Sequence, residues 1–247
     1  MIKQNVSRIF PLVLLLVLFA SCSRKYKVDG VSSVTSFDGK MLMFKTLRDG
    51  QWITVDSAEV VHGLFSASGP LDSVMMVTLY MNDEAIMPLV LERGKIEVSI
   101  SNSQLTAKGT PLNNALYEFI EKRNELELKI EELERKEARM VLDGAALDDI
   151  HEQLAKEGEV LIKEMNDYVK GFITTNYENV LGPSVFMMVC GTLPYPVMTP
   201  QVEDIIRTAP QSFKSNPLVR DFLDKAKENM KLIEEHQRMQ ESAAVRK

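Results

Sequence analysis

Two cysteines are the residues with the most distinctive chemistry in this chain of 247 residues. Cys22 follows a long apolar run, whereas Cys190 lies far away in the apolar segment 185–191. A cysteine thiolate is a nucleophile and a metal ligand, and a neighbouring cation lowers the pKa of the thiol. The sequence places no cation beside Cys190, so it favours a buried, inert thiol, with a redox role as the weaker alternative.

The N-terminal residues are expected to form an export signal rather than a folded element. Lys3 and Arg8 precede and flank an apolar run at 9–20, which is shorter than the roughly 20 residues needed to cross a bilayer. A positive start, a short apolar run and small residues before a cleavage point are typical of secretory signals. The sequence therefore predicts a signal peptide over residues 1–21.

The residues around the first cysteine indicate a particular kind of signal. The segment 18–22 closely resembles the lipobox of bacterial lipoproteins, and this resemblance implies cleavage before Cys22 and diacylglycerol and palmitate on that residue. Several acyl chains hold a protein at a membrane far better than one chain does. We therefore expect a lipid anchor at Cys22; an ordinary cleaved signal with a chance cysteine is the alternative.

The segment that follows the expected anchor is basic. Residues 23–27 include Arg24, Lys25 and Lys27 and contain no carboxylate. In some Gram-negative bacteria, an acidic tract just after the lipidated cysteine resembles a signal for display on the cell surface, and that tract is absent here. We expect a protein of the bacterial cell envelope, attached to the outer membrane and facing the periplasm.

Composition limits the classes of partner. Residues 1–21 carry two cations and no carboxylate, so the remaining chain has 27 cationic and 35 anionic side chains, a net charge of −8. An acidic chain lacks the electrostatic footprint of nucleic-acid binding, and no nucleic acid partner is expected. With lipid on Cys22, Cys190 is the only thiol left, so no disulfide can form within the mature chain.

Other reactive side chains do not form a recognisable motif. His62, His151 and His236 are far apart in the sequence and lack the spacing of a metal site. Asp56 and Ser57 have no nucleophile motif around them and no histidine partner, and the glycines are spread over separate turns rather than gathered in a phosphate loop. The sequence indicates no catalytic residue, no cofactor and no metal site, and favours a protein that is not an enzyme.

Aromatic side chains offer one candidate binding surface. Trp52 and the strand end at Tyr80 and Met81 form either a small surface for a glycan or an apolar ligand, or ordinary packing in the core or at a sheet edge. Packing is the favoured interpretation for a single tryptophan on a strand. The 14 methionines add adaptable apolar faces.

Residues 22–109 have the pattern of short β-strands. The alternation is clearest where Ile96, Val98 and Ile100 share one side of a strand. Phe65 and Ala67 are likewise expected to face the core together, and glycine-containing turns separate the runs. We predict an α+β fold whose N-terminal domain is an antiparallel β-sandwich of roughly seven or eight strands.

The periodicity becomes helical after Gly109, where Thr110 and Pro111 suit the start of a helix. Apolar residues then recur at steps of three and four along 116–140 and again along 147–168. We expect a helical domain over 110–235 that begins with a long helical hairpin. Shorter helices are expected near 183–191, after Thr199 and after Asn216, and residues 236–247 are expected to form a flexible tail.

The apolar stripe of the first helix has two interpretations. It packs on the sandwich and the other helices, which is favoured, or it binds a partner helix or a second copy, with Arg123 and Glu137 setting the register. The opposite face carries charged residues, and Lys129 and Lys136 follow glutamates by four positions, the favoured order for ion pairs on a helix. The carboxylates of residues 118–137 are therefore expected on a solvated face.

Several short segments match a known domain in order and spacing. They are residues 26–30, 39–42, 56–58, 63–69, 91–96 and 109–113. Together they resemble a domain of unknown function near the N-terminus of many thiol–disulfide interchange lipoproteins of anaerobic Gram-negative bacteria, over about residues 26–114. The helices that follow are similar in placement to the linker helices of those proteins.

The chain departs from that family at the residues that carry its activity. In the full-length relatives a thioredoxin-like domain follows, in which one thiol of a Cys-x-x-Cys pair attacks and the other resolves the mixed disulfide. This sequence contains no Cys-x-x-Cys, so the oxidoreductase activity is not carried over.

The leading expectation is a membrane-anchored envelope lipoprotein that acts as a non-catalytic interaction or scaffold module, with an envelope protein as a partner. One alternative is a redox-linked accessory of a thioredoxin-like system that uses Cys190. Another is a module that binds glycans or small apolar ligands. The sequence does not indicate an oligomeric state.

Overall fold

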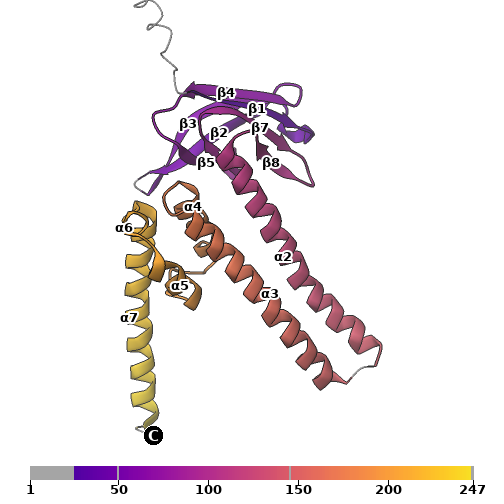
Figure 1. The fold of residues 1–247 in the computed structure, drawn as a ribbon, viewed down its shortest axis with the longest axis vertical. Coiled ribbons are helices and arrows are strands. Elements are labelled where there is room, and N and C mark those ends of the chain that lie inside the picture. The colour runs from indigo at the N-terminus through magenta and orange to yellow at the C-terminus, as the bar shows by residue number, and fades with distance from the viewer. Residues whose placement is uncertain (1–24, 49, 145, 246–247) are drawn as a thin grey trace, which may run out of the picture.

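The computed structural model describes residues 25–48, 50–144 and 146–245. The signal peptide predicted over 1–21 and the predicted lipidation site Cys22 lie outside these residues. Two four-stranded sheets form a sandwich at one end, and the helices extend from it on one side (Figure 1). The predicted α+β architecture, a β-sandwich followed by a helical region with a long hairpin, is confirmed.

The sandwich consists of two sheets, which we call the β1 sheet and the β2 sheet. The β1 sheet has the strand order β4-β1-β7-β8, and the β2 sheet has the order β3-β2-β5-β6. The strands are β1 (Lys25–Ser32), β2 (Met41–Arg48), β3 (Gln51–Glu59), β4 (Leu64–Pro70), β5 (Met75–Met81), β6 (Glu84–Leu91), β7 (Gly94–Ile100) and β8 (Leu105–Lys108). A short 3₁₀ helix, η1 (Thr35–Phe37), connects β1 to β2.

Alternating side chains place one face of each sheet in the core. Ile96, Val98 and Ile100 are buried in β7, and Phe65 and Ala67 are buried in β4, as the sequence predicts. The strand pairs are antiparallel except that of β1 with β7, which is parallel. Alternation has the same period in both arrangements, so it does not predict the direction of this pair.

Six α-helices follow the strands in the described part of the chain. They are α2 (Pro111–Leu142), α3 (Leu147–Thr175), α4 (Leu181–Cys190), α5 (Pro200–Thr208), α6 (Gln211–Lys214) and α7 (Pro217–Val245). The predicted hairpin corresponds to α2 and α3, and α5 begins as predicted, with the Thr199 hydroxyl accepting a hydrogen bond from Val202 N–H at 3.2 Å. Two features were not predicted: the single turn α6, and the helical backbone of α7 over residues 236–245, where the sequence analysis places a flexible tail.

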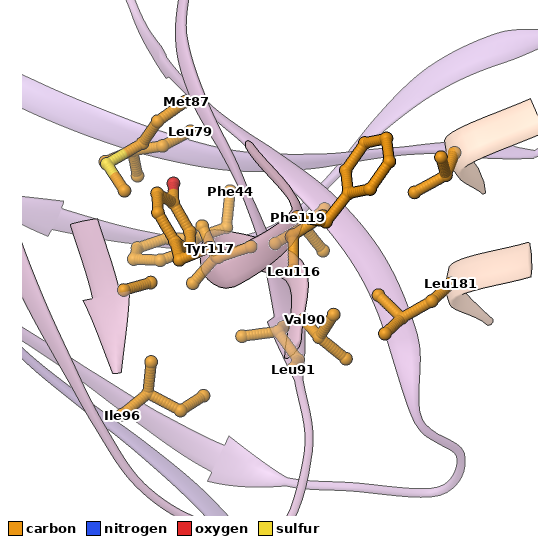
Figure 2. Close-up of a cluster of buried hydrophobic side chains, with 14 of the residues drawn as sticks. Phe44, Leu79, Met87, Val90, Leu91, Ile96, Leu116, Tyr117, Phe119 and Leu181 are labelled. Carbon is orange, nitrogen blue, oxygen red and sulfur yellow. The ribbon is translucent and has the colours of Figure 1, made fainter. Parts of the chain in front are cut away.

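The first turns of α2 complete the core of the sandwich. Leu116 and Phe119 are fully buried. Figure 2 shows them beside Val90 and Leu91 of β6, with Leu181 of α4 nearby. Burying each such side chain contributes about 1.5–3 kcal/mol. A single cluster of buried apolar side chains therefore runs from the sandwich into the helices.

Hydrogen bonds tie the start of α2 to the edge strand β6. Asn113 Oδ1 accepts from Val90 N–H at 2.9 Å, and Asn113 Nδ2 donates to the Val90 carbonyl at 2.7 Å. The side-chain amide thus pairs with the strand edge much as a neighbouring strand would. Glu92 Oε1 accepts from the N–H groups of Leu112 and Asn113 at 2.8 and 3.0 Å, and so satisfies two donors that a helix start leaves unpaired. We call these contacts the β6–α2 junction.

Two further residues hold the junction in place. The Tyr117 hydroxyl donates to the Pro88 carbonyl at 2.8 Å, at a position of β6 where proline presents no N–H. Gly109 turns the chain from β8 into α2 with φ of +97°, and a Cβ there would lie 2.5 Å from the Lys95 carbonyl oxygen. Only glycine suits this position, as its role between sheet and helix predicts.

The apolar stripe of α2 packs within the chain. Leu126 of α2 and Ile150 of α3 are fully buried, and the two helices contact each other along the hairpin (Figure 1). The predicted ion pair of Lys129 with Glu125 is present at 2.7 Å. Lys136 behaves differently, because it crosses to Glu157 of α3 and donates to both carboxylate oxygens at 2.7 Å. The favoured interpretation of the stripe, packing inside the molecule, is confirmed.

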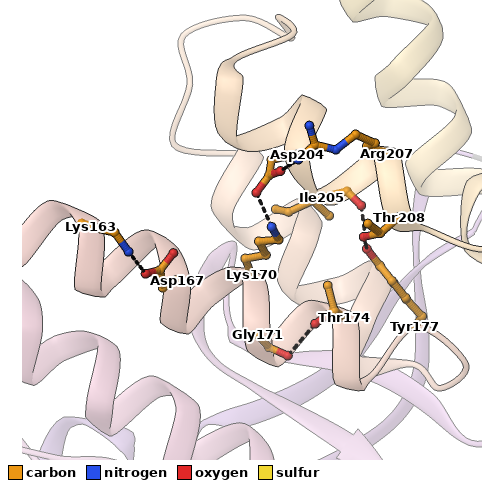
Figure 3. Close-up of polar contacts among 10 residues, drawn as sticks. All are labelled: Lys163, Asp167, Lys170, Gly171, Thr174, Tyr177, Asp204, Ile205, Arg207 and Thr208. Carbon is orange, nitrogen blue, oxygen red and sulfur yellow. Dashed lines mark hydrogen bonds and ion pairs between the residues drawn. The ribbon is translucent and has the colours of Figure 1, made fainter.

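Polar contacts hold α5 against the end of α3 (Figure 3). Lys170 of α3 and Arg207 of α5 both pair with the Asp204 carboxylate. The pKa of Asp204 lies below its ordinary value, because Lys170 donates a hydrogen bond to the carboxylate. The Tyr177 hydroxyl donates to the Ile205 carbonyl at 2.6 Å. These contacts set the position of the helices at the base of the hairpin.

Replacing Asn113 with alanine tests the β6–α2 junction. The substitution leaves the buried N–H and C=O of Val90 without their partners, and each such group costs about 1–3 kcal/mol, so the free energy of unfolding should fall by about 2–4 kcal/mol. Urea denaturation followed by circular dichroism measures the change. Asn124→Ala, at an exposed position of the same helix, is the matched control and should change stability by less than about 0.5 kcal/mol. Equal losses in the two variants would contradict a special role for Asn113.

Candidate functional site

Cys190 is the one cysteine in the described part of the chain. It is the last residue of α4, is only 4% exposed, and belongs to the apolar core together with Val185 and Phe186. Burial raises the pKa of the Cys190 thiol to about 12, so the thiol stays protonated at neutral pH. The predicted burial of this side chain is confirmed, and the site offers no geometry that would activate the sulfur.

The histidines lie in three different elements. His62 occupies the β3–β4 turn with φ of +52°, His151 of α3 lies 3.3 Å from the Glu137 carboxylate, and His236 lies on α7. Within the described residues, no three His, Cys, Asp or Glu side chains are grouped closely enough to hold a metal ion.

Some segments shared with the resembling domain make contacts at the two edges of the β2 sheet. Glu92, Leu112 and Asn113 of these segments take part in the β6–α2 junction. At the opposite edge, the Tyr26 hydroxyl of β1 donates to Asp56 Oδ2 of β3 at 2.6 Å and thereby links the two sheets. Burial and the Asp56 carboxylate raise the pKa of Tyr26. Asp56 thus has a structural partner rather than a catalytic one.

A groove of about 1030 Å³ runs along α2 beside the β7–β8 turn. The turn at 101–104 forms one wall, and Glu118, Glu121 and Asn124 of α2 line the other. The Glu125 carboxylate also lines it, and its pKa is lowered by hydrogen bonds from Lys129 and then Lys122. The lining offers polar donors and acceptors but contains no histidine or cysteine that could pair with a nucleophile.

An aromatic pair lies on the outer face of the β2 sheet. The rings of Trp52 and Tyr80 meet edge to face with centroids 5.5 Å apart, and Lys45 Nζ lies 4.6 Å from the centre of the Tyr80 ring. Trp52 is 52% exposed, on the edge strand β3. Of the two packing positions that the sequence analysis left open for Trp52, core or sheet edge, the structure has the edge.

The helical arms expose apolar side chains to solvent. Leu142 at the tip of the hairpin is 86% exposed, and Val160 on α3 is 66% exposed. The second half of α7 is almost entirely exposed over 231–240 (Figure 1). Each described helix is too short or too polar to cross a membrane.

Sequence reasoning missed two groups of residues. The first is the β6–α2 junction. Asn113, a polar residue that is buried in the first turn of a helix, is the feature that could have revealed it. The second is a set of exposed aliphatic residues on the outer face of the β1 sheet, Val31, Val61 and Leu64. Leu64 directly precedes Phe65 in a strand, and two successive strand residues cannot both face the core.

Burial of the Cys190 thiol predicts very slow alkylation. In the full chain with Cys22→Ser, where Cys190 is the only thiol, a maleimide at pH 8 should leave it unmodified for hours and should modify it fully after denaturation. Adding Thr192→Cys, an exposed position two residues further on, gives the matched control that should react within minutes. Rapid modification of Cys190 in the folded chain, counted by mass spectrometry, would contradict its burial.

The comparisons with known proteins concern the N-terminal part of the chain. Residues 26–116 match the family described as Domain of unknown function (DUF4369). No curated protein matches the chain. The matched region covers β1 from its second residue, the seven other strands and the start of α2, so it ends just after the β6–α2 junction and before the projecting part of the hairpin.

Proposed function

We propose that this protein is a bacterial envelope lipoprotein, anchored through lipid on Cys22, whose sandwich and helical arms serve as a non-catalytic interaction or scaffold module. The lipobox resemblance at 18–22 supports the anchor. The basic segment after Cys22 supports a periplasm-facing position at the outer membrane. The anchor would join the membrane to β1, which begins three residues later at Lys25.

The observation that carries the proposal is the rigid attachment of a long arm to the sandwich. The β6–α2 junction bonds α2 to a strand edge and the core buries its first turns, so the hairpin has a defined direction. The 32 residues of α2 extend for about 48 Å at 1.5 Å per residue. The hairpin and α7 extend away from the sandwich (Figure 1), so a lipid attached before β1 would leave both arms free to meet partners.

Exposed apolar residues on the arms support partner binding. Leu142 and Val160 are mostly exposed, and residues 231–240 of α7 are almost entirely exposed. Apolar groups on a projecting element are typical of protein contact sites. The resemblance to accessory domains of thiol–disulfide interchange lipoproteins suggests that such a partner belongs to the envelope. Burial of Cys190 weighs against the alternative in which this thiol performs redox chemistry.

Site-specific photo-crosslinking in intact cells tests the proposal. A photoreactive residue at Val160 should yield one or a few discrete crosslinked species, because this exposed position lies on the arm. The same residue at Glu84, the exposed first residue of β6 in the sandwich, is the matched control and should yield none of them.

The anchor is tested in the same cells. Cys22→Ser should abolish labelling with radioactive palmitate, release the protein from the membrane fraction, and reduce the Val160 crosslinks at least tenfold. Identical species from Val160 and Glu84 would overturn the interaction role, and full membrane retention of Cys22→Ser would overturn the lipid anchor.

The aromatic pair supports ligand binding as a second candidate function. A half-exposed indole beside a tyrosine ring and a lysine is a suitable platform for the apolar face of a sugar. Trp52 is the only tryptophan in the chain, so its fluorescence reports this surface alone.

We expect envelope oligosaccharides to shift Trp52 emission in a saturable way. Tyr80→Ala should weaken the apparent affinity by about tenfold, a loss of about 1.4 kcal/mol. Tyr195→Ala, at a tyrosine that is 52% exposed elsewhere, is the matched control and should leave the affinity unchanged. Unchanged emission at millimolar oligosaccharide would exclude this second function.

A further inference from the structure

The outer face of the β1 sheet carries three exposed aliphatic residues that lie together. Val31, Val61 and Leu64 are 54%, 51% and 58% exposed. Val31 lies opposite Leu64 in the ladder between β1 and β4, and Val61 bridges to Leu64. They border a shallow hollow of about 920 Å³ on this face. We call these three residues the outer aliphatic cluster.

Lysines and carboxylates share the same face of the sheet, and the lysines of β1 and β7 lie toward the end nearer Lys25. Lys27 pairs with Asp29 at 2.8 Å, and Lys95 pairs with Glu97 at 2.7 Å, while Glu59 is a third carboxylate that lines the hollow. The pKa of Asp29 is lowered, first because Lys27 donates a hydrogen bond to it. Lys25 and Lys108 also lie at exposed positions of β1 and β8. The face therefore carries four lysines, Lys25, Lys27, Lys95 and Lys108, against the three carboxylates Asp29, Glu59 and Glu97, on a mature chain whose net charge is −8.

The position of the expected anchor brings this face close to a membrane. Cys22 precedes Lys25 by three residues, which span at most about 11 Å when fully extended. The exposed side chains of β1 start at Lys25 and end at Val31, so the strand leads from the anchor to the outer aliphatic cluster. Figure 1 shows β1 and β4 at the end of the molecule opposite the C-terminus, and no described helix covers their outer face.

We propose that the outer face of the β1 sheet lies on the lipid bilayer, with the outer aliphatic cluster at the headgroup boundary and the lysines of the same face among anionic headgroups. This inference rests on the proposed function, because lipid on Cys22 holds the face at the membrane. A covalent lipid and a surface of aliphatic and basic side chains together provide two membrane contacts, which fix orientation as well as attachment. The helical arms then point away from the bilayer.

Spin labelling of the full lipoprotein tests this orientation. The protein is purified with its lipid, labelled at Leu64→Cys, and reconstituted in vesicles of phosphatidylethanolamine and phosphatidylglycerol. Cys190 is buried and should not take the label. Val160→Cys, another exposed aliphatic position but on the arm, is the matched control. Collision rates with oxygen, which concentrates in lipid, and with a water-soluble nickel chelate measure the depth of each label.

We expect the Leu64 label to collide at least threefold more often with oxygen than with the nickel chelate, and the Val160 label to show the reverse. A Leu64 label that is as accessible to nickel as the Val160 label would overturn the proposal. Low collision rates with both reagents at Leu64 would also overturn it, because they would show that a protein covers the face. If Leu64→Cys lowers the thermal midpoint, Val61→Cys takes its place, since this residue is also half-exposed.

The mass of the purified protein separates the two proposals. A mass without acyl chains would overturn the anchor, and with it the membrane-facing orientation. A lipidated protein whose Leu64 label lies in water would overturn the orientation alone and leave the anchored scaffold intact.

Discussion

The pairing of the Asn113 side chain with the backbone of Val90 is the interaction on which the arrangement of the two halves depends. An edge strand presents unpaired N–H and C=O groups that would otherwise bind water or another chain. Here α2 begins against the edge of β6, and its own side chains take those groups. Leu116 and Phe119, on the next turns, fill the core, so tilting the helix would break polar and apolar contacts together.

These coupled contacts explain how an arm of two long helices can keep a fixed orientation relative to the sandwich. The hairpin meets the sandwich only near its base, yet its own stripe and the Lys136–Glu157 contact keep α2 and α3 together beyond it. At the other edge, Tyr26 and Asp56 link the two sheets. The outer face of the β1 sheet and the arms remain as separate surfaces, one toward the expected anchor and one away from it.

Local features were predictable because they follow from residue order. The strand at 94–100, the helix starts at Pro111, Pro200 and Pro217 and the positive φ of Gly109 all follow from periodicity or from backbone sterics. The parallel pairing of β1 with β7, the Lys136 ion pair and the environment of Asn113 join residues far apart in the sequence. No local sequence pattern specifies which of these distant residues come into contact, because the same side chains could pair with several other partners.

The sequence by itself determined the two-part architecture, the expected lipid site at Cys22 and the absence of a Cys-x-x-Cys motif. Those conclusions rest on residue types and on their spacing along the chain, because these determine both export signals and secondary structure. Only the tertiary structure decided that Cys190 is buried, that Trp52 meets Tyr80, and that Val31, Val61 and Leu64 share one surface. Burial and adjacency are properties of the packed chain, because they depend on which strands become neighbours and which faces the helices cover.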